Sequence, residues 1–161
     1  MEIYLLRHAI AEEARQGQRD SDRALTDMGR EKLRRVLKRA RAAGVKPDLI
    51  VSSPYRRALE TAAAAAATLG YEGKVVTTQA LIPNASPQDV WEEIRRHKEE
   101  AAILLAGHEP QMSALAAFLL NSPALVVEMK KAGLIRMDCD QFGPQPRCVL
   151  KWMLTPSLAA E

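Results

Sequence analysis

Hydrophobic positions along the chain follow two periodicities that alternate from the N-terminus onward. Short apolar runs, typical of buried strands, occur at 3–6, 48–53 and 101–106, and a further short strand is expected at 74–78. Stretches with apolar residues three and four positions apart, typical of amphipathic helices, follow these runs at 27–43, 54–70, from 86 onward and at 111–120. This alternation predicts an α/β fold, a three-layer α/β/α sandwich with a mainly parallel sheet.

Residues suited to helix ends support these boundaries. Thr26 can accept a hydrogen bond from the first turn of the first helix, and Gly44 suits the end of that helix. Pro54 suits the first turn of the second helix, which is expected to end at Gly70. The six consecutive alanines at 62–67 lie inside this second helix, where their small side chains predict close packing on the sheet.

The C-terminal part of the chain has a different pattern. The sequence LIRMDCDQFGPQPRCVLKWML at 134–154 contains two strand-like runs around a loop rich in Gly and Pro, which predicts an antiparallel hairpin. Placing Met137 opposite Leu150 makes one face of the hairpin apolar. The same register places Arg136 opposite Lys151, an unfavourable pair of like charges.

Length and composition indicate one globular domain at 1–161. The 161 residues, 47% hydrophobic and 27% charged, are enough to form a core. No apolar stretch approaches the roughly 20 residues that cross a bilayer, so no membrane partner is expected. The start MEIYLL lacks the features of a signal peptide, which predicts a cytoplasmic location. No apolar stripe stands out beyond the core, so the sequence does not indicate an oligomeric state.

Basic charge is spread among acidic residues. The net charge of +3 and the pI of about 9.0 suggest a mild affinity for polyanions. The main basic concentration, GREKLRRVLKRARAAG at 29–44, also carries apolar residues at helical spacing and therefore predicts a helix with a solvated basic face. This segment contains no interleaved aromatic residues, and the chain has no known nucleic-acid-binding motif, so no nucleic-acid partner is expected.

Polar residues follow three of the predicted strands. Arg7 and His8 come directly after the first strand, Arg56 and Arg57 follow the second after a short turn, and His108 follows the fourth. The carboxyl ends of parallel strands meet at one edge of a sheet, so these side chains are expected to gather there. Guanidinium groups match the oxygens of a tetrahedral dianion, and a neutral imidazole can attack phosphorus. The pattern therefore predicts a phosphoryl-transfer site.

Four motifs in order, LLRHA, LTDMG, VSSPYRRALETA and LAGHEP, resemble the histidine phosphatase superfamily, which has a phosphoglycerate mutase-like fold. The short length and lack of long insertions are most similar to its small bacterial phosphohistidine phosphatases, the SixA type. This resemblance implies that His8 is the phosphorylated nucleophile and that Arg7 and Arg56 bind phosphate. It also implies that His108 contributes hydrogen bonding and charge, and that Arg23, directly before ALT, is a further substrate ligand.

Arg57 and His97 are expected to lie outside this site. Arg57 is interpreted as a solvated helix residue, because its neighbour Arg56 takes the motif position. His97 lies inside a predicted helix among charged residues, and with three histidines in the chain no zinc site is indicated. Neither a metal nor another cofactor is therefore expected.

Two departures from the family pattern bear on the substrate. Ala9 stands where the first motif usually has glycine, which removes no catalytic group. No Asp or Glu occurs from Thr77 to Gln88, where many phosphomonoesterases and mutases of the superfamily place the acid that protonates the leaving oxygen. The labile phosphorus–nitrogen bond of phosphohistidine needs such an acid less, so this absence favours a phosphoamidate. Four acids of the loop after the first strand remain possible proton donors: Glu12, Glu13, Asp20 and Asp22.

The leading functional prediction is a phosphohistidine phosphatase. It would remove phosphate from a phosphorylated histidine-containing protein of a phosphorelay or transport system, through a phosphohistidine enzyme intermediate. One alternative is a phosphomonoesterase for small sugar or nucleotide phosphates. A non-catalytic phosphate-sensing module would use the same pocket without turnover. All three need the arginines that bind phosphate, so anion binding does not separate them.

Overall fold

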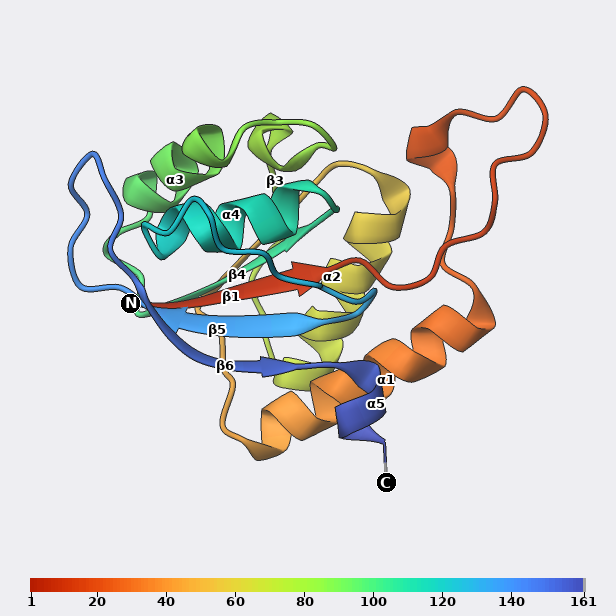
Figure 1. Ribbon diagram of the computed structural model, residues 1–161. Coiled ribbons are helices and arrows are strands. Elements are labelled where there is room, and N and C mark those ends of the chain that lie inside the picture. The colour runs from red at the N-terminus through yellow and green to blue at the C-terminus, as the bar shows by residue number, and fades with distance from the viewer. Residues whose placement is uncertain (161) are drawn as a thin grey trace.

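The computed structural model describes residues 1–160, which contain one six-stranded sheet with helices on both faces (Figure 1). The strand order is β3-β2-β4-β1-β5-β6, with β1 Glu2–Arg7, β2 Leu49–Ser52, β3 Val76–Thr77, β4 Ala102–Gly107, β5 Leu134–Asp138 and β6 Val149–Leu154. The helices are α1 Asp27–Ala42, α2 Arg56–Leu69, α3 Pro87–Arg96, α4 Gln111–Leu119 and α5 Pro156–Ala159, with short 3-10 helices η1 Asp20–Asp22 and η2 Gln79–Leu81. Strands β1 to β4 run parallel, whereas β5 and β6 are antiparallel to their neighbours, so the predicted fold class is confirmed.

Alternate side chains of the inner strands belong to two hydrophobic cores, one on each face of the sheet. On β1, Ile3 and Leu5 belong to the core that contains Trp91 of α3. Leu6 of the same strand belongs to the core that contains Leu37 of α1. Because helices cover both faces, the inner strands are apolar throughout, and they therefore appear in the sequence as continuous runs.

Three of the predicted helix ends, at Thr26, Gly44 and Gly70, are formed by the expected residues. The Oγ1 of Thr26 accepts a hydrogen bond of 2.9 Å from the backbone N of Gly29 in the first turn of α1. Gly44 and Gly70, which follow α1 and α2, have φ values of +85° and +72°, in the left-handed region that glycine adopts most easily. Every helix in the described part of the chain is too short or too polar to cross a bilayer.

Helix α2 differs from its prediction at the start. It begins at Arg56, because Tyr55 has an extended backbone conformation, and Pro54 therefore lies in the preceding turn and not in the first helical turn. Ala62 and Ala65 are fully buried against the sheet, as expected of small residues at a close approach. The remaining alanines of the run lie partly or fully at the surface.

The C-terminal hairpin is present, but its register shifts along its length. Met137 lies opposite Leu150, as predicted. The predicted pairing of Arg136 with Lys151 is wrong, because a bulge between Arg136 and Met137 places Trp152 opposite Arg136. Lys151 is the extra residue of this bulge, so the bulge keeps the two like charges from facing each other across the strands.

Candidate active site

The site is formed where β1 and β4 end side by side. These strands are parallel neighbours in which Arg7 lies opposite Gly107, so the next residues, His8 and His108, emerge together at the same edge of the sheet. The backbone N of His8 donates a 2.9 Å hydrogen bond to the carbonyl of Gly107, and the two imidazole rings lie 5.1 Å apart between centroids. The structure thus brings together two histidines that are 100 positions apart in the sequence.

The hydrogen bonds of His8 define which ring nitrogen is free to react. Its Nδ1 lies 2.7 Å from the carbonyl oxygen of Ala9, which can only accept, so Nδ1 carries the proton and Nε2 has an unshared pair. The Nε of Arg57 donates to this Nε2 at 3.4 Å. Burial, followed by the charges of Arg57 and Arg7, lowers the pKa of His8 to about 4. His8 is therefore neutral at pH 7, as a histidine nucleophile must be.

His108 forms the second wall of the site. Its Nε2 lies 2.8 Å from the Oγ of Ser53, and this hydrogen bond fixes the orientation of the imidazole. The ring of Tyr55 contacts the imidazole edge-on, with 5.2 Å between the two ring centroids. Burial is the main cause that lowers the pKa of His108 to about 3, and His8 and Arg57 add to it. His108 is therefore also neutral at pH 7 and can act as a hydrogen-bonding group.

The structure places Arg57, not Arg56, in the site. The side chain of Arg57 is 5% exposed, and its Nη1 and Nη2 donate to the backbone oxygen and the Oδ2 of Asp20 at 2.9 and 3.1 Å. Arg56 is 56% exposed and forms an ion pair of 3.2 Å with Glu60, one turn along α2. The expected placement of these two arginines is wrong, because adjacent residues of a helix point about 100° apart.

A helical pattern in the sequence would have identified the correct arginine. Arg57 and Thr61 are four positions apart, and together with Ala58, Ala62 and Ala65 they form the buried face of α2. The Oγ1 of Thr61 donates to the carbonyl of Arg57 at 2.7 Å and accepts from the backbone N of Ala9 at 3.1 Å. Thr61 thus connects the face of α2 that carries Arg57 to the turn that follows His8.

Ala9, which replaces the usual glycine, fits this turn without backbone strain. Its side chain is fully buried, and its φ is not among the positive values of the described residues. A methyl group is therefore accommodated in the conformation that the turn requires.

Arg7 and Arg23 also carry guanidinium groups in this region. The Nη1 of Arg7 donates to the carbonyl of Met129 at 2.7 Å, whereas its buried Nε has no hydrogen-bond partner within the described residues. Arg23 donates from Nε to the Oδ1 of Asp20 at 2.9 Å and from Nη1 to the carbonyl of Glu12 at 3.1 Å. Arg23 and Arg57 therefore bind the same carboxylate, and Arg7 retains most of its donors for a ligand.

Asp20 is the loop acid that contacts these arginines. Burial pushes its pKa upward, but the charges and hydrogen bonds of Arg57 and Arg23 outweigh this effect and hold the pKa below its usual value. Asp20 is therefore ionised at neutral pH and positions two guanidinium groups, and it holds no proton to give. Glu109, directly after His108, accepts a 2.7 Å hydrogen bond from the backbone N of Ser113 in the first turn of α4.

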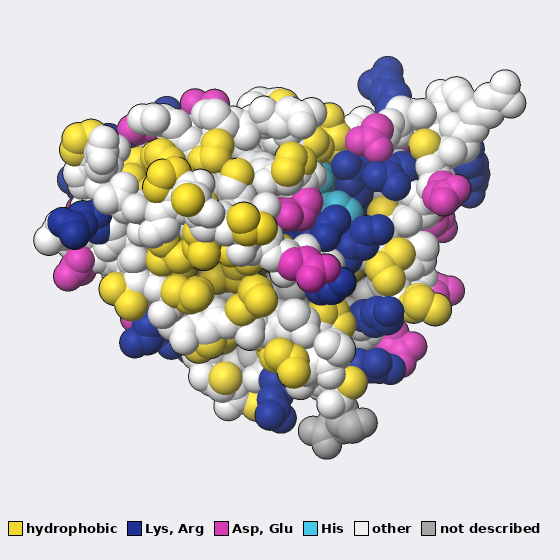
Figure 2. Space-filling model, in the orientation of Figure 1, with side chains coloured by type: hydrophobic (Ala, Val, Ile, Leu, Met, Phe, Trp, Pro, Cys, Tyr) yellow, Lys and Arg dark blue, Asp and Glu magenta, His cyan; other side chains and the backbone are white. Residues whose placement is uncertain are grey.

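The surface around the histidines is basic. Figure 2 shows histidine side chains in a recess among Lys and Arg side chains. Guanidinium groups around a neutral imidazole can bind the oxygens of a phosphoryl group and hold its phosphorus close to the imidazole nitrogen. Within residues 1–160, no three His, Cys, Asp or Glu side chains lie close enough together to hold a metal ion.

Acidification is expected to destabilise the protein through the two site histidines. Their folded-state pKa values of about 4 and 3 lie below the ordinary 6.5, so the unfolded state binds more protons as the pH falls below 6.5. Going from pH 7 to pH 5 should remove on the order of 1–2 kcal/mol of unfolding free energy per histidine. Urea unfolding at both pH values measures the loss, and the double variant His8→Asn/His108→Asn should lose less. An equal loss in both proteins would contradict this assignment.

Known proteins resemble this chain in sequence. The family model "Histidine phosphatase superfamily (branch 1)" matches residues 3–82. An uncharacterized protein of Picosynechococcus sp. is 34% identical over 139 residues, which cover 84% of this chain and 83% of that protein.

Solved structures share the whole fold. The protein histidine phosphatase SixA complexed with tungstate has a TM-score of 0.86 at 21% identity, covering 98% of both chains. The putative phosphohistidine phosphatase SixA from Agrobacterium tumefaciens has a TM-score of 0.83 at 28% identity, covering 96% of this chain and 97% of that one. Further solved phosphatases, a phosphoserine phosphatase and an alpha-ribazole phosphatase among them, share the fold at lower similarity.

Proposed function

The chain belongs to the histidine phosphatase superfamily and is a metal-independent phosphatase with a catalytic histidine. On this premise we propose that it dephosphorylates phosphohistidine on a partner protein. The observation that carries this proposal is the state of His8. Its Nδ1 is bonded to the Ala9 carbonyl, and its unprotonated Nε2 lies 3.4 Å from Arg57 in a pocket that keeps the ring neutral. A neutral imidazole with an unprotonated nitrogen beside guanidinium groups is what attack on a phosphoryl group needs.

In the first step, the hydrogen bond between Arg57 Nε and His8 Nε2 breaks, and the unshared pair of Nε2 attacks the phosphorus of the substrate in line with the bond that breaks. The phosphorus–nitrogen bond of the substrate breaks, and its electron pair stays on the departing imidazole. This ring takes a proton from water. Water then attacks the phosphohistidine on His8, which releases inorganic phosphate and restores the neutral ring.

The arginines stabilise the charge that moves onto the phosphoryl oxygens. Two of the five N–H groups of Arg57 are bonded to Asp20, and the Nε–H that His8 accepts is freed when His8 Nε2 attacks, which leaves three for the substrate. Arg7 uses one N–H on the Met129 carbonyl, and its other N–H groups have no hydrogen-bond partner in the described part of the chain. Planar guanidinium groups hold these donors in a fixed geometry before the reaction begins, so little reorganisation is needed in the transition state.

The protonation state of Asp20 supports a phosphoamidate substrate over a phosphate ester. An alkoxide leaving group needs a proton donor, and a general acid typically contributes 10²–10⁴-fold. Asp20 is the loop acid that reaches the site arginines, and they hold it in the ionised form. Imidazole departs from phosphorus with less help than an alkoxide does.

The experiment that tests this proposal compares substrates. Turnover of a phosphohistidine protein and of phosphoramidate is measured beside a panel of sugar, nucleotide and serine phosphates. The expected result is a kcat/KM for the phosphorus–nitrogen substrates at least about 100-fold above that for any ester, as a missing general acid would produce. A preference for esters would instead support a small-molecule phosphomonoesterase, and no turnover of any substrate would support a phosphate sensor.

A further inference from the structure

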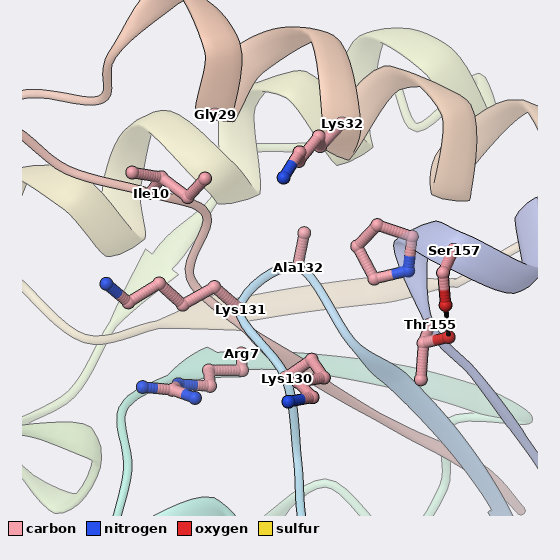
Figure 3. Close-up of a pocket in the computed structure, with 10 residues that line it drawn as sticks. Arg7, Ile10, Gly29, Lys32, Lys130, Lys131, Ala132, Thr155 and Ser157 are labelled. Carbon is pink, nitrogen blue, oxygen red and sulfur yellow. Dashed lines mark hydrogen bonds between the residues drawn. The ribbon is translucent and has the colours of Figure 1, made fainter. Parts of the chain in front are cut away.

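A cavity of about 480 Å³ opens beside Arg7 and is lined by other basic residues (Figure 3). It lies between α1, the segment that precedes β5, and the start of α5. Arg7, Lys32, Lys130 and Lys131 line it, together with the hydroxyl groups of Thr155 and Ser157. No Asp or Glu side chain is among the described residues that line it. The cavity is thus positively charged, and it shares Arg7 with the active site.

Two of the three lysines that line this cavity have no ion-pair partner among residues 1–160. Lys130 forms an ion pair of 2.7 Å with the exposed Glu128. Within residues 1–160, neither Lys32 nor Lys131 forms an ion pair with a carboxylate. Like charges gathered without counter-ions repel one another, and an anionic ligand would relieve this repulsion. A ligand in this cavity would therefore gain from its negative charge as well as from contacts.

The position of the cavity is fixed by the same elements that build the active site. Gly29 lets the first turn of α1 approach the backbone of Ile10, where any Cβ would collide with the Ile10 carbonyl. This contact places Lys32, one turn further along α1, at the edge of the cavity in Figure 3. The carbonyls of Arg7 and His8 both accept hydrogen bonds from the backbone N of Ala132, which anchors the lysine-bearing segment next to the nucleophile.

We propose that this cavity is a second anion-binding subsite, which binds an acidic side chain flanking the phosphohistidine on the protein substrate. The proposal rests on the phosphohistidine phosphatase function. Planar guanidinium groups suit the phosphoryl group. Lysine ammonium groups are compact charges on flexible side chains, so they can bind a carboxylate from several directions. A phosphohistidine protein brings its own surface to the site, so its neighbouring residues must face this cavity or the adjoining surface.

The test uses two synthetic phosphohistidine peptides that differ in charge. One has glutamates on both sides of the phosphohistidine, and the other has glutamines in those positions. At low salt the wild-type protein is expected to show a KM about three- to tenfold lower for the acidic peptide, with similar kcat, as two exposed ion pairs would produce. Added salt should reduce the difference, because it screens exposed charges.

Variants assign this preference to the cavity. The double variant Lys32→Gln/Lys131→Gln should treat both peptides alike. The control Lys38→Gln removes an exposed lysine of the same helix α1 that lies outside the cavity, so it should keep the preference. Equal KM values in the wild type, or a preference that survives in the double variant, would overturn the proposal.

Binding provides a readout that does not depend on catalysis. Calorimetry with the unphosphorylated forms of the same peptides should give a lower Kd for the acidic peptide, and the double variant should lose this difference. If neither phosphopeptide is hydrolysed, the proposed function fails, and the calorimetric comparison still decides whether the subsite exists. Equal Kd values for the two peptides would refute the subsite while leaving the function intact.

Discussion

Replacing His8 with alanine is expected to abolish turnover of phosphohistidine substrates, with a fall in kcat/KM of at least about 10⁴-fold. The variant loses the nitrogen that forms the covalent intermediate, and no other group is placed to take over its role. The wild-type protein should also trap phosphate in a form that is labile to acid and stable to base, whereas His8→Ala should trap none. Turnover of phosphoramidate and rapid acid–base quenching measure the two effects.

The third histidine of the chain offers a matched control. His97 follows α3 and lies near Glu93, with 3.5 Å between its Nε2 and the Glu93 Oε1. His97→Ala removes an imidazole outside the site and should keep kcat/KM within about twofold of the wild type, as surface substitutions usually do. Equal turnover by wild type and His8→Ala would contradict the mechanism, provided that both proteins unfold at similar urea concentrations.

The second large effect is a difference in kcat/KM between alanine variants of two adjacent arginines. Arg57→Ala is expected to lower kcat/KM by about 10²–10³-fold, because it removes donors held against the reacting phosphoryl group. Arg56→Ala should change kcat/KM by no more than about twofold, since this side chain is exposed and pairs with Glu60 at the surface. Steady-state kinetics of the two variants with phosphoramidate make the comparison directly.

A conservative change at the same position tests the role of the guanidinium group. Arg57→Lys keeps the positive charge but loses the planar fork and its contacts with Asp20, so it should recover only part of the lost activity. Thermal unfolding of each variant shows whether a loss comes from folding or from the site. A larger loss in Arg56→Ala than in Arg57→Ala would mean that the motif position belongs to Arg56 after all.

Much of the fold could be predicted from local patterns, because the patterns have local causes. A strand covered by helices on both faces must be apolar throughout, so β1, β2 and β4 appear as continuous apolar runs. Parallel strands end at the same edge, so Arg7, His8 and His108 could be expected together before any coordinates were known. The missing acid between 77 and 88 was likewise visible in the sequence alone.

Three-dimensional packing decided the features that local patterns leave open. The helical pattern of α2 indicates that Arg57 is buried, but only the packing of the loop that carries Asp20 onto α2 brings Arg57 to its carboxylate partner. The bulge at Lys151 depends on which side chains meet across the hairpin. The basic cavity combines Arg7, Lys32 and Lys131 from separate segments. Such features depend on contacts between residues far apart in the chain, and these contacts exist only once the layers have packed.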